Sequence, residues 1–249
     1  MTDPILKVEQ LVKTFGGVTA TDHVDFDVMP GEIHAVIGPN GAGKTTFVAQ
    51  IAGMLRQDSG SIVFDGREIG RMPAAQRSHA GLARSFQITS VFKNFTAQEN
   101  VALSLQAHAG HSFRFWKRAS TDERLVEPAR KILADVGLAD RALVLAGNLA
   151  HGEQRQLEIA MALATSPKML LLDEPTAGMG TEESETMRAF MKALKGRYSM
   201  LLIEHDMDTV FSLADRVTVL VYGRGIATGT PEEIRNNAEV RAAYLGEDE

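Results

Sequence analysis

The sequence predicts an α/β fold with a parallel-sheet core, an antiparallel β part near the N-terminus and an inserted helical segment. Three observations support this fold class. An apolar run at 33–37 is followed by a glycine-rich loop and an amphipathic stretch over 45–55. Apolar strands and helical stretches alternate over 169–222, which is typical of parallel strands joined by helices. Residues 98–165, between these parts, have helical spacing.

Strands are expected before the helical segment. In one of them Val24, Phe26 and Val28 alternate with aspartates, which is the period of a half-buried strand. Turn residues follow closely on each run, so we expect antiparallel, hairpin-linked pairing. The strands predicted here, besides 33–37, are 5–11, 24–28 and 61–65, and a short apolar stretch follows at 82–86.

Helices dominate the middle of the chain, and regular alternation returns after it. The predicted helices of the insert are 100–108, 121–136 and 153–164. The later elements are strands 169–172, 199–203 and 216–222, helices 182–194 and 207–213, and a short helix that Pro231 opens with Thr230 as its cap. We therefore assign 1–249 to a single domain, with the α/β core in about 1–86 and 166–249 and a helical subdomain in about 87–165.

Composition fits an ordinary soluble globular protein, with 249 residues, 44% hydrophobic and 23% charged. The net charge of −6 argues weakly against nucleic acid, and no such partner is expected. The absence of cysteine excludes disulfides and thiolate ligands, which suits a reducing cytosol. Residues 1–4 lack the basic and apolar regions of a signal peptide, so none is expected, and there is no apolar run of the roughly 18 residues that span a bilayer. Any membrane association is therefore expected to be peripheral or through a partner.

The loop after 33–37 carries a phosphate-binding motif. Its sequence, Gly38-Pro39-Asn40-Gly41-Ala42-Gly43-Lys44-Thr45, fits G-x-x-x-x-G-K-[ST]. The glycines let backbone N–H groups approach phosphate oxygens, and the following helix adds positive charge at its N-terminus. Lys44 is expected to reach the β- and γ-phosphates, and the Thr45 hydroxyl to bind Mg²⁺. Together with Thr46, this stretch predicts a P-loop fold with ATP and Mg²⁺ as cofactors.

Two carboxylates end the apolar strand 169–172. Open α/β sheets bind ligands at the carboxyl edge of their strands, so we expect Asp173 and Glu174 beside the phosphates. Asp173 is placed to hold Mg²⁺, directly or through water, and Glu174 to orient or deprotonate the attacking water. Adjacent strand residues point to opposite faces, so the two roles should differ. A solvated strand end is the alternative interpretation.

A second polar strand end lies at Leu202-Ile203-Glu204-His205-Asp206. His205 could donate a hydrogen bond to the γ-phosphate or hold the attacking water. A lone histidine after a strand is more often structural, but the parallel-sheet setting favours the functional interpretation.

The chain resembles an ATP-binding-cassette (ABC) ATPase over nearly its whole length. The motifs that carry the resemblance are the phosphate loop, Gln87, Leu149-Ala150-His151-Gly152-Glu153, Asp173-Glu174 and His205. The resemblance implies that Phe15 stacks on adenine and that Gln87 contacts Mg²⁺ or water and relays the nucleotide state to a permease. It also implies that residues 149–153 form the signature loop, which caps the γ-phosphate held by the phosphate loop of a second ATPase subunit.

Within this family the chain is similar to the ATPase subunit of branched-chain amino-acid importers. The matching stretches are Arg84-Ser85-Phe86-Gln87, Glu153-Gln154-Arg155-Gln156-Leu157-Glu158-Ile159-Ala160, Ile203-Glu204-His205-Asp206-Met207 and Ala243-Tyr244-Leu245-Gly246-Glu247. The resemblance implies an identical or paralogous second ATPase, integral-membrane permease subunits, an indirectly acting solute-binding protein, and a peripheral place on the cytoplasmic face of the inner membrane. The alternatives are a urea or amide importer, a lipopolysaccharide exporter, a soluble ABC ATPase acting on ribosomes or DNA, and a regulator without catalysis.

The chain departs from the usual Leu-Ser-Gly-Gly-Gln signature. Ala150 replaces the serine, His151 the first glycine and Glu153 the glutamine. We expect that the imidazole of His151 lies near the second subunit's γ-phosphate and that its protonation tunes ATP-driven dimerisation; simple packing is the alternative. Gly180 stands where the family usually has an aspartate, so the carboxylate that the resemblance implies for communication between subunits is missing at this position.

Three further groups have no motif to define them. A permease-docking surface is expected around 87–99, where Phe92 and Phe95 could line a groove or belong to a local core. The aromatic and basic residues 113–118 could touch headgroups, a partner or nucleic acid, although packing back onto the helices is the plainer interpretation. His108 and His111 are expected to be solvated rather than metal-binding.

Overall fold

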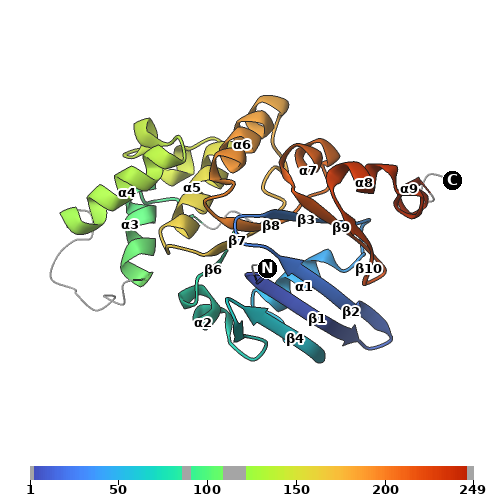
Figure 1. Cartoon of the computed structure of the whole chain (residues 1–249). Helices are drawn as coiled ribbons and strands as arrows, with labels where there is room; N and C mark the ends of the chain where they lie inside the picture. Colours follow the sequence, from blue (N-terminus) through green and yellow to red (C-terminus); the bar gives the residue numbers. More distant parts are fainter. Residues whose placement is uncertain (1–2, 86–90, 109–121, 246–249) are drawn as a thin grey trace.

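The structure is a computed structural model that describes residues 3–85, 91–108 and 122–245. Its centre is a six-stranded sheet in the order β10-β9-β3-β8-β7-β6 (Figure 1). Neighbouring strands are parallel from β9 to β6, and β10 pairs antiparallel with β9 at the edge. The bounds are β3 (Ile33–Ile37), β6 (Leu82–Arg84), β7 (Met169–Asp173), β8 (Ser199–Ile203), β9 (Arg216–Val221) and β10 (Arg224–Gly229).

A second, antiparallel sheet has the order β2-β1-β4-β5. Its strands are β1 (Leu6–Phe15), β2 (Val18–Val28), β4 (Ser59–Phe64) and β5 (Arg67–Glu68). Register shifts interrupt the pairing of β1 with β2 and with β4. The predicted hairpin pairing is confirmed, while β1 and β2 are longer than expected because these shifts break the alternation that marks a strand.

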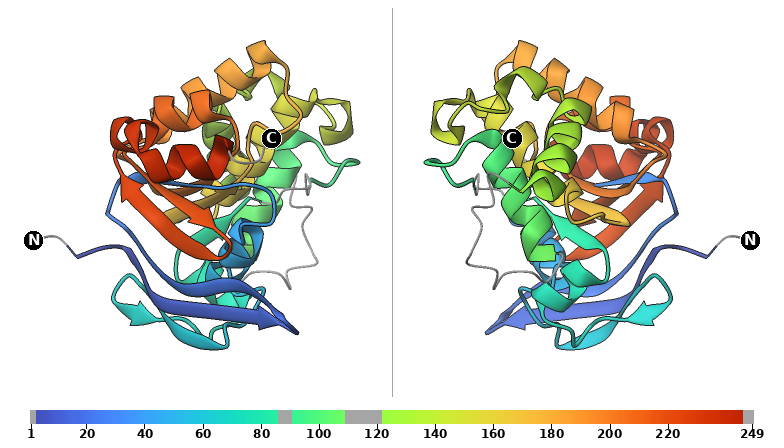
Figure 2. Two further views of the ribbon diagram at one scale, coloured as in Figure 1. Left: turned by 90° about the vertical axis from the view of Figure 1, so that its right-hand side faces the viewer. Right: turned by 90° about the vertical axis from the view of Figure 1, so that its left-hand side faces the viewer.

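The central sheet is apolar on both faces, which is why its strands are continuous apolar runs. Leu170 and Leu172 of β7 face one core, and Leu171 faces the other. The first core lies under α5 (His151–Leu163), α6 (Thr181–Leu194) and α7 (Met207–Leu213). The second contains α1 (Lys44–Ile51) and the inner face of the antiparallel sheet. The side views show the resulting layers, with the antiparallel sheet on one side of the central sheet and helices on the other (Figure 2).

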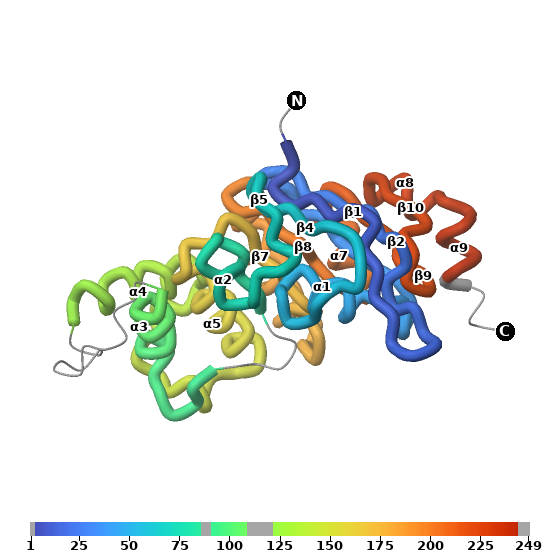
Figure 3. The backbone as a smooth tube through the Cα atoms, turned by 90° about the horizontal axis from the view of Figure 1, so that it is seen from below, coloured from blue at the N-terminus to red at the C-terminus, as the bar shows by residue number. Residues whose placement is uncertain are grey.

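Helices α3 (Ala97–His108), α4 (Glu123–Asp135) and α5 pack against one another beside the sheet (Figure 3). Asp122 caps α4 by accepting from the Arg124 N–H, and Thr230 caps α8 as predicted. The other helices are α2 (Ala74–His79), α8 (Pro231–Asn236) and α9 (Ala238–Leu245), and short 3₁₀ turns cover 139–141 and 146–148. Neither β5 nor α2 was predicted, since both are short and lack an apolar period.

The predictions for His108 and for Phe92 and Phe95 can be compared with the structure. His108 was expected to be solvated, but it is half-buried and its ring stacks on His79 with the centroids 5.4 Å apart. Phe92 and Phe95 stay exposed and contact each other, so they are not a local core. His111 and residues 113–118 lie outside the described residues. In the part of the chain that is described, no helix is long and apolar enough to cross a membrane.

Candidate functional site

The phosphate loop turns tightly between β3 and α1, and two of its glycines are sterically required. A Cβ on Gly38 would lie 2.2 Å from the carbonyl oxygen of Leu220, and one on Gly43 would lie 2.0 Å from that of Ala20. Both contacts are far shorter than real Cβ contacts, and Gly43 also has φ +100°. The loop is therefore packed tightly between β9 and β2, and only glycine fits at these two positions.

The Lys44 side chain folds back onto the phosphate loop. Its ammonium group donates hydrogen bonds to the carbonyl oxygens of Gly38 and of Pro39, the latter at 2.9 Å. Burial lowers the pKa of Lys44, while the nearby carboxylates of Glu174 and Asp173 oppose this shift. The charges of these two acids therefore act on the Lys44 ammonium. This agrees with the prediction that the phosphate loop after β3 and the acids at the end of β7 lie near each other at one edge of the sheet.

The remaining loop residues fit an anion-binding helix start. Thr45 is exposed in the first turn of α1 and Thr46 is half-buried. Asn40 and Gly41 are exposed at the tip of the loop. No acidic residue lies in the first turn of α1, and no side chain caps it. The N-terminal N–H groups and their partial charge are therefore available to a phosphate.

Asp173 is the last residue of β7 and is almost fully buried. One of its oxygens, Oδ2, accepts a hydrogen bond from Nη2 of Arg84 at 2.9 Å. Arg84 belongs to the neighbouring strand β6, where it pairs with Leu171, two residues before Asp173. Side chains two apart in a strand share a face, so the sheet itself brings the guanidinium to the carboxylate. No role is predicted for Arg84 from the sequence.

Glu174 lies just beyond the strand, in a left-handed conformation with φ +48°. Its N–H donates to the carbonyl oxygen of Ile203 at 2.9 Å, and its own carbonyl accepts from Ala177 at 3.1 Å. The prediction that the two acids point to opposite faces of one strand is therefore wrong, because β7 ends at Asp173. The two acids differ through this backbone turn instead. A non-glycine residue held at positive φ costs of the order of 1–3 kcal/mol and is often found at functional sites.

His205 and Glu204 follow β8 and have opposite environments. The His205 side chain is 65% exposed, whereas Glu204 is fully buried. Glu204 accepts hydrogen bonds from the backbone N–H and the hydroxyl of Thr176, at 3.0 and 2.5 Å. It thereby ties the end of β8 to the segment that follows Glu174. No role is predicted for Glu204 from the sequence, although an acid directly after a buried apolar strand is a detectable signal.

The signature loop, residues 149–153, leads into α5. Ala150 is the N-cap residue and His151 the first helical residue. Glu153 accepts from the Ala150 N–H at 2.9 Å and from Arg141 Nε at 2.7 Å. Burial alone would raise the pKa of Glu153, but these two donors outweigh it and the pKa lies below its usual range. Gly152 is buried, and a Cβ there would lie 3.3 Å from a Glu183 carboxylate oxygen of α6.

His151 is exposed, and its Nε2 lies 3.4 Å from the carbonyl oxygen of Ala177. The imidazole therefore contacts the loop that starts at Glu174 in the same chain. Phe15, at the end of β1, is 49% exposed, with the Lys13 ammonium 5.5 Å from its ring centre. Gln87 lies outside the described residues. Gly180, at the position usually occupied by aspartate, is the N-cap of α6.

The donor set fits a magnesium ion. Among the described residues, no group of three or more His, Asp or Glu side chains is placed to hold a metal alone. Mg²⁺ is usually bound by one or two carboxylates, with water and substrate phosphates completing its octahedron. The single carboxylate of Asp173 and the exposed hydroxyl of Thr45 match that requirement, and ATP would supply the phosphate oxygens.

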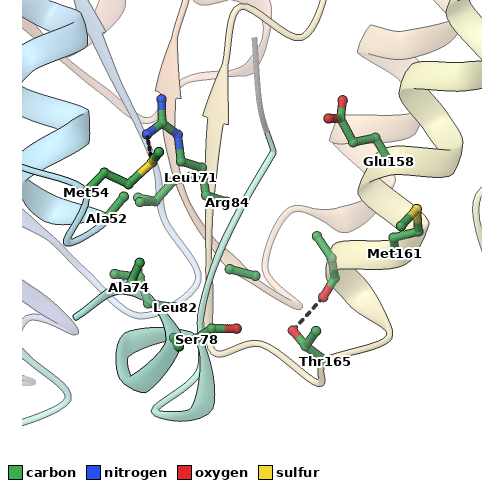
Figure 4. A pocket seen from close by; sticks show the side chains of 13 residues that line it. Ala52, Met54, Ala74, Ser78, Leu82, Arg84, Glu158, Met161, Thr165 and Leu171 are labelled. Atoms are coloured by element: carbon green, nitrogen blue, oxygen red, sulfur yellow. Dashed lines mark hydrogen bonds between the residues drawn. The ribbon is translucent and has the colours of Figure 1, made fainter. Parts of the chain in front are cut away.

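A cavity of about 350 Å³ opens next to this site, between the end of α1, α2, β6 and α5 (Figure 4). Met54, Ala74 and Arg84 lie on the core side, and Glu158 and Met161 of α5 lie opposite. Most of the surface that lines the cavity is apolar. A docking surface is predicted at 87–99, but of the residues described there none lines this cavity.

Comparison with known proteins agrees with the motifs. A family model described as ABC transporter matches residues 21–177, and a second, described as branched-chain amino acid ATP-binding cassette transporter, matches 226–249. The chain is 39% identical to the high-affinity branched-chain amino acid transport ATP-binding protein BraF of Pseudomonas aeruginosa, and 38% identical to LivG of Escherichia coli. Both alignments cover 99% of this chain and 100% of the relative. The lipopolysaccharide export ATP-binding protein LptB of Haemophilus influenzae is less similar, at 33% over 98% of each chain.

A comparison with solved structures agrees with the sequence comparison. A crystal structure of the ADP conformation of MJ1267, an ATP-binding cassette of an ABC transporter, superposes with a TM-score of 0.87 at 31% identity. The match covers 98% of this chain and 100% of that one. The family match spans the phosphate loop, the signature loop and Asp173-Glu174, and the full-length relatives carry it to both ends of the chain. The chain therefore belongs to the ABC transporter family, as one of its ATP-hydrolysing subunits.

Proposed function

We propose that this chain is the ATPase subunit of an importer for branched-chain amino acids. The observation that carries the substrate class is the match of residues 226–249 to the branched-chain amino-acid model, which is separate from the general family match over 21–177. The full-length identity to BraF and LivG supports the same class. The subunit would work at the cytoplasmic face of the membrane.

The proposed nucleotide site combines the phosphate loop with the ends of β7 and β8. The loop from Gly38 to Thr46 would bind the phosphates of ATP, and Phe15 would stack on the adenine. Lys44 would neutralise the β- and γ-phosphates, which its place inside the loop supports. Asp173 and Thr45 would hold Mg²⁺, whose bound form neutralises charge on the phosphates.

The proposed hydrolytic residues are Glu174 and His205. Glu174 would orient the attacking water and accept its proton, and its fixed backbone turn supports a defined position for the carboxylate. His205 would donate to the γ-phosphate, and its exposed side chain beside buried Glu204 is compatible with reaching a ligand. Gln87 would sense the metal or the water, as the family resemblance implies.

A second ATPase would complete the site. The signature loop of one subunit, with Ala150, His151, Gly152 and Glu153, would cap the γ-phosphate bound by the other. The N-terminus of α5 supports this role, because its free N–H groups suit an anion. ATP would thus join two subunits head to tail, and hydrolysis would separate them.

The permease would dock in the cavity between the core and α5. This apolar cavity of about 350 Å³ has α2 and β6 on one side and α5 on the other, and its size suits a short amphipathic helix. A solute-binding protein would act through the permease and would not touch this chain.

Uptake measurements test the substrate class. Cells that lack this subunit should lose energy-dependent uptake of labelled leucine, isoleucine and valine, and the intact gene should restore it. Lys44→Ala serves as the matched variant and should fail to restore uptake. Unchanged uptake of these amino acids, with loss of urea or amide uptake instead, would assign the same ATPase to a different importer.

A further inference from the structure

The Arg84 side chain connects the proposed metal carboxylate with the cavity. Its Nη2 donates to Asp173 at 2.9 Å, and its Nη1 lies 3.0 Å from the Met54 sulfur. Met54 and Arg84 both line the cavity, and Figure 4 shows them on the same wall. The side chains of Arg84 and Asp173 are only 13% and 3% exposed. One guanidinium therefore contacts both the proposed metal carboxylate and a residue of the cavity wall.

We propose that Arg84 is a positioning residue that competes with Mg²⁺ for Asp173 and transmits the outcome to the cavity. This inference rests on the proposed nucleotide site. A carboxylate that is almost fully buried is stabilised by a cation, and Arg84 supplies that cation through a charge-assisted hydrogen bond. Mg²⁺ brings two further positive charges to the same carboxylate, so the guanidinium and the metal repel each other.

Arg84 is anchored on the edge strand β6 beside β7; its side chain lines the cavity, and its Nη1 already contacts Met54. A guanidinium that leaves Asp173 therefore stays on the cavity wall, where water in the open cavity can solvate it. By reciprocity, an apolar segment that fills the cavity expels this water, holds Arg84 on Asp173 and weakens metal binding. A docking segment with a carboxylate facing Arg84 would have the opposite effect.

Magnesium titrations test the competition. Binding of a methylanthraniloyl derivative of β,γ-imido-ATP, which is not hydrolysed, is followed by fluorescence as Mg²⁺ is added. Competition and repulsion both weaken metal binding in the wild type, so Arg84→Gln should lower the half-saturating Mg²⁺ concentration roughly tenfold. Arg84→Lys, which keeps the charge, should stay near the wild type. Exposed Arg56 provides a matched charge-removal control, Arg56→Gln, with no expected change.

The outcomes separate this inference from the proposed function. A wild-type protein that binds no nucleotide, or binds it without regard to Mg²⁺, would remove the proposed site itself. A wild type that binds in a Mg²⁺-dependent way, with an unchanged or higher half-saturating concentration in Arg84→Gln, would overturn only the role of Arg84. A higher value would mean that Arg84 orients Asp173 for the metal instead of competing with it.

A reporter in the cavity tests the second half of the proposal. The chain has no cysteine, so Ser78→Cys on the cavity wall of α2 can carry a single environment-sensitive dye. Adding Mg²⁺ with the imido nucleotide should change the dye emission in this variant. The change should disappear in Ser78→Cys with Arg84→Gln, although the double variant still binds nucleotide. An equal change in both would show that the cavity senses the nucleotide by another route.

Discussion

Glu174 illustrates how one residue's backbone determines its chemistry. Its φ of +48° turns the chain immediately after the buried carboxylate of Asp173, and an N–H bond to Ile203 holds that turn against β8. The turn therefore gives the two adjacent acids different surroundings. Asp173 stays buried beside a cation, which suits a metal ligand, and Glu174 is directed out of the strand, which suits a group that handles water.

We predict that Glu174→Gln lowers ATP turnover roughly 10²- to 10⁴-fold, the usual contribution of a positioned acid or base. The amide cannot accept a proton, but it has nearly the same shape, so ATP affinity should remain. Phosphate release and nucleotide binding measured on the same preparation check this. Glu232→Gln, at an exposed position on α8, is the matched control. Normal turnover in Glu174→Gln would remove the residue from the mechanism.

The signature-loop histidine gives a second prediction at this scale. His151 is exposed at the start of α5, so its imidazole can meet a second subunit's phosphate. A positively charged imidazole there would attract that phosphate and strengthen ATP-driven association. We therefore predict that His151→Tyr changes the pH profile of ATPase activity. Identical profiles for the two proteins would leave His151 with a packing role only.

At the scale of elements, β3 contains a buried polar chain that none of the motifs requires. His34 is fully buried, and its Nδ1 donates to the Asp27 carbonyl oxygen at 2.6 Å. Its Nε2 therefore accepts from the Thr218 hydroxyl at 2.8 Å, and Thr218 in turn contacts Thr228. The chain of bonds joins β3, β9 and β10 to β2 and fixes the neutral form of the ring. Burial lowers the pKa of His34 from 6.5 to about 4.

This pKa predicts an acid-sensitive stability. Below about pH 6.5 the unfolded chain takes up a proton on His34 that the folded chain refuses until about pH 4. The contribution is therefore complete above pH 6.5 and is lost as the pH falls toward 4, and the pKa difference sets its upper size at roughly 3 kcal/mol. Denaturant unfolding from pH 7 to pH 4 should show a smaller loss in His34→Gln than in the wild type. Parallel stability curves would contradict this.

The elements also show what a sequence can and cannot predict. The runs of β7 and β8 are apolar on both faces, and this pattern located them and the acids at their ends. The pairing of β1 contains register shifts, so its apolar alternation predicted a strand shorter than the observed one. Helix α2 has only six residues and no apolar period, so it was not predicted at all. The Arg84–Asp173 pair depends on β6 lying beside β7, a long-range pairing that no local pattern reveals.

At the scale of the whole molecule, the elements of the nucleotide site come from the carboxyl ends of neighbouring strands of the central sheet and from the N-terminus of α5. The phosphate loop follows β3, the acids follow β7, and the signature loop stands at the start of α5 (Figure 1). This distribution suits a site that two subunits complete, with the cavity between the core and α5 as the place where a permease would sense the nucleotide state.

Association tests this arrangement. Glu174→Gln with Mg-ATP should form a dimer, alone or with a paralogous ATPase, and ADP should return it to monomers, as measured by light scattering after size exclusion. Adding Ala150→Glu should abolish the dimer, because a carboxylate at this exposed position would repel the γ-phosphate. A dimer that persists with ADP, or that tolerates Ala150→Glu, would contradict the head-to-tail site.

The most direct test of the central claim is to extract the tagged subunit from membranes in a mild detergent and to identify what co-purifies. The account predicts two polytopic permease subunits together with a second ATPase, and retention of this complex by the catalytically impaired Glu174→Gln variant. Recovery with ribosomes or DNA, and with no membrane protein, would contradict the account and would assign the same ATPase chemistry to a role outside transport.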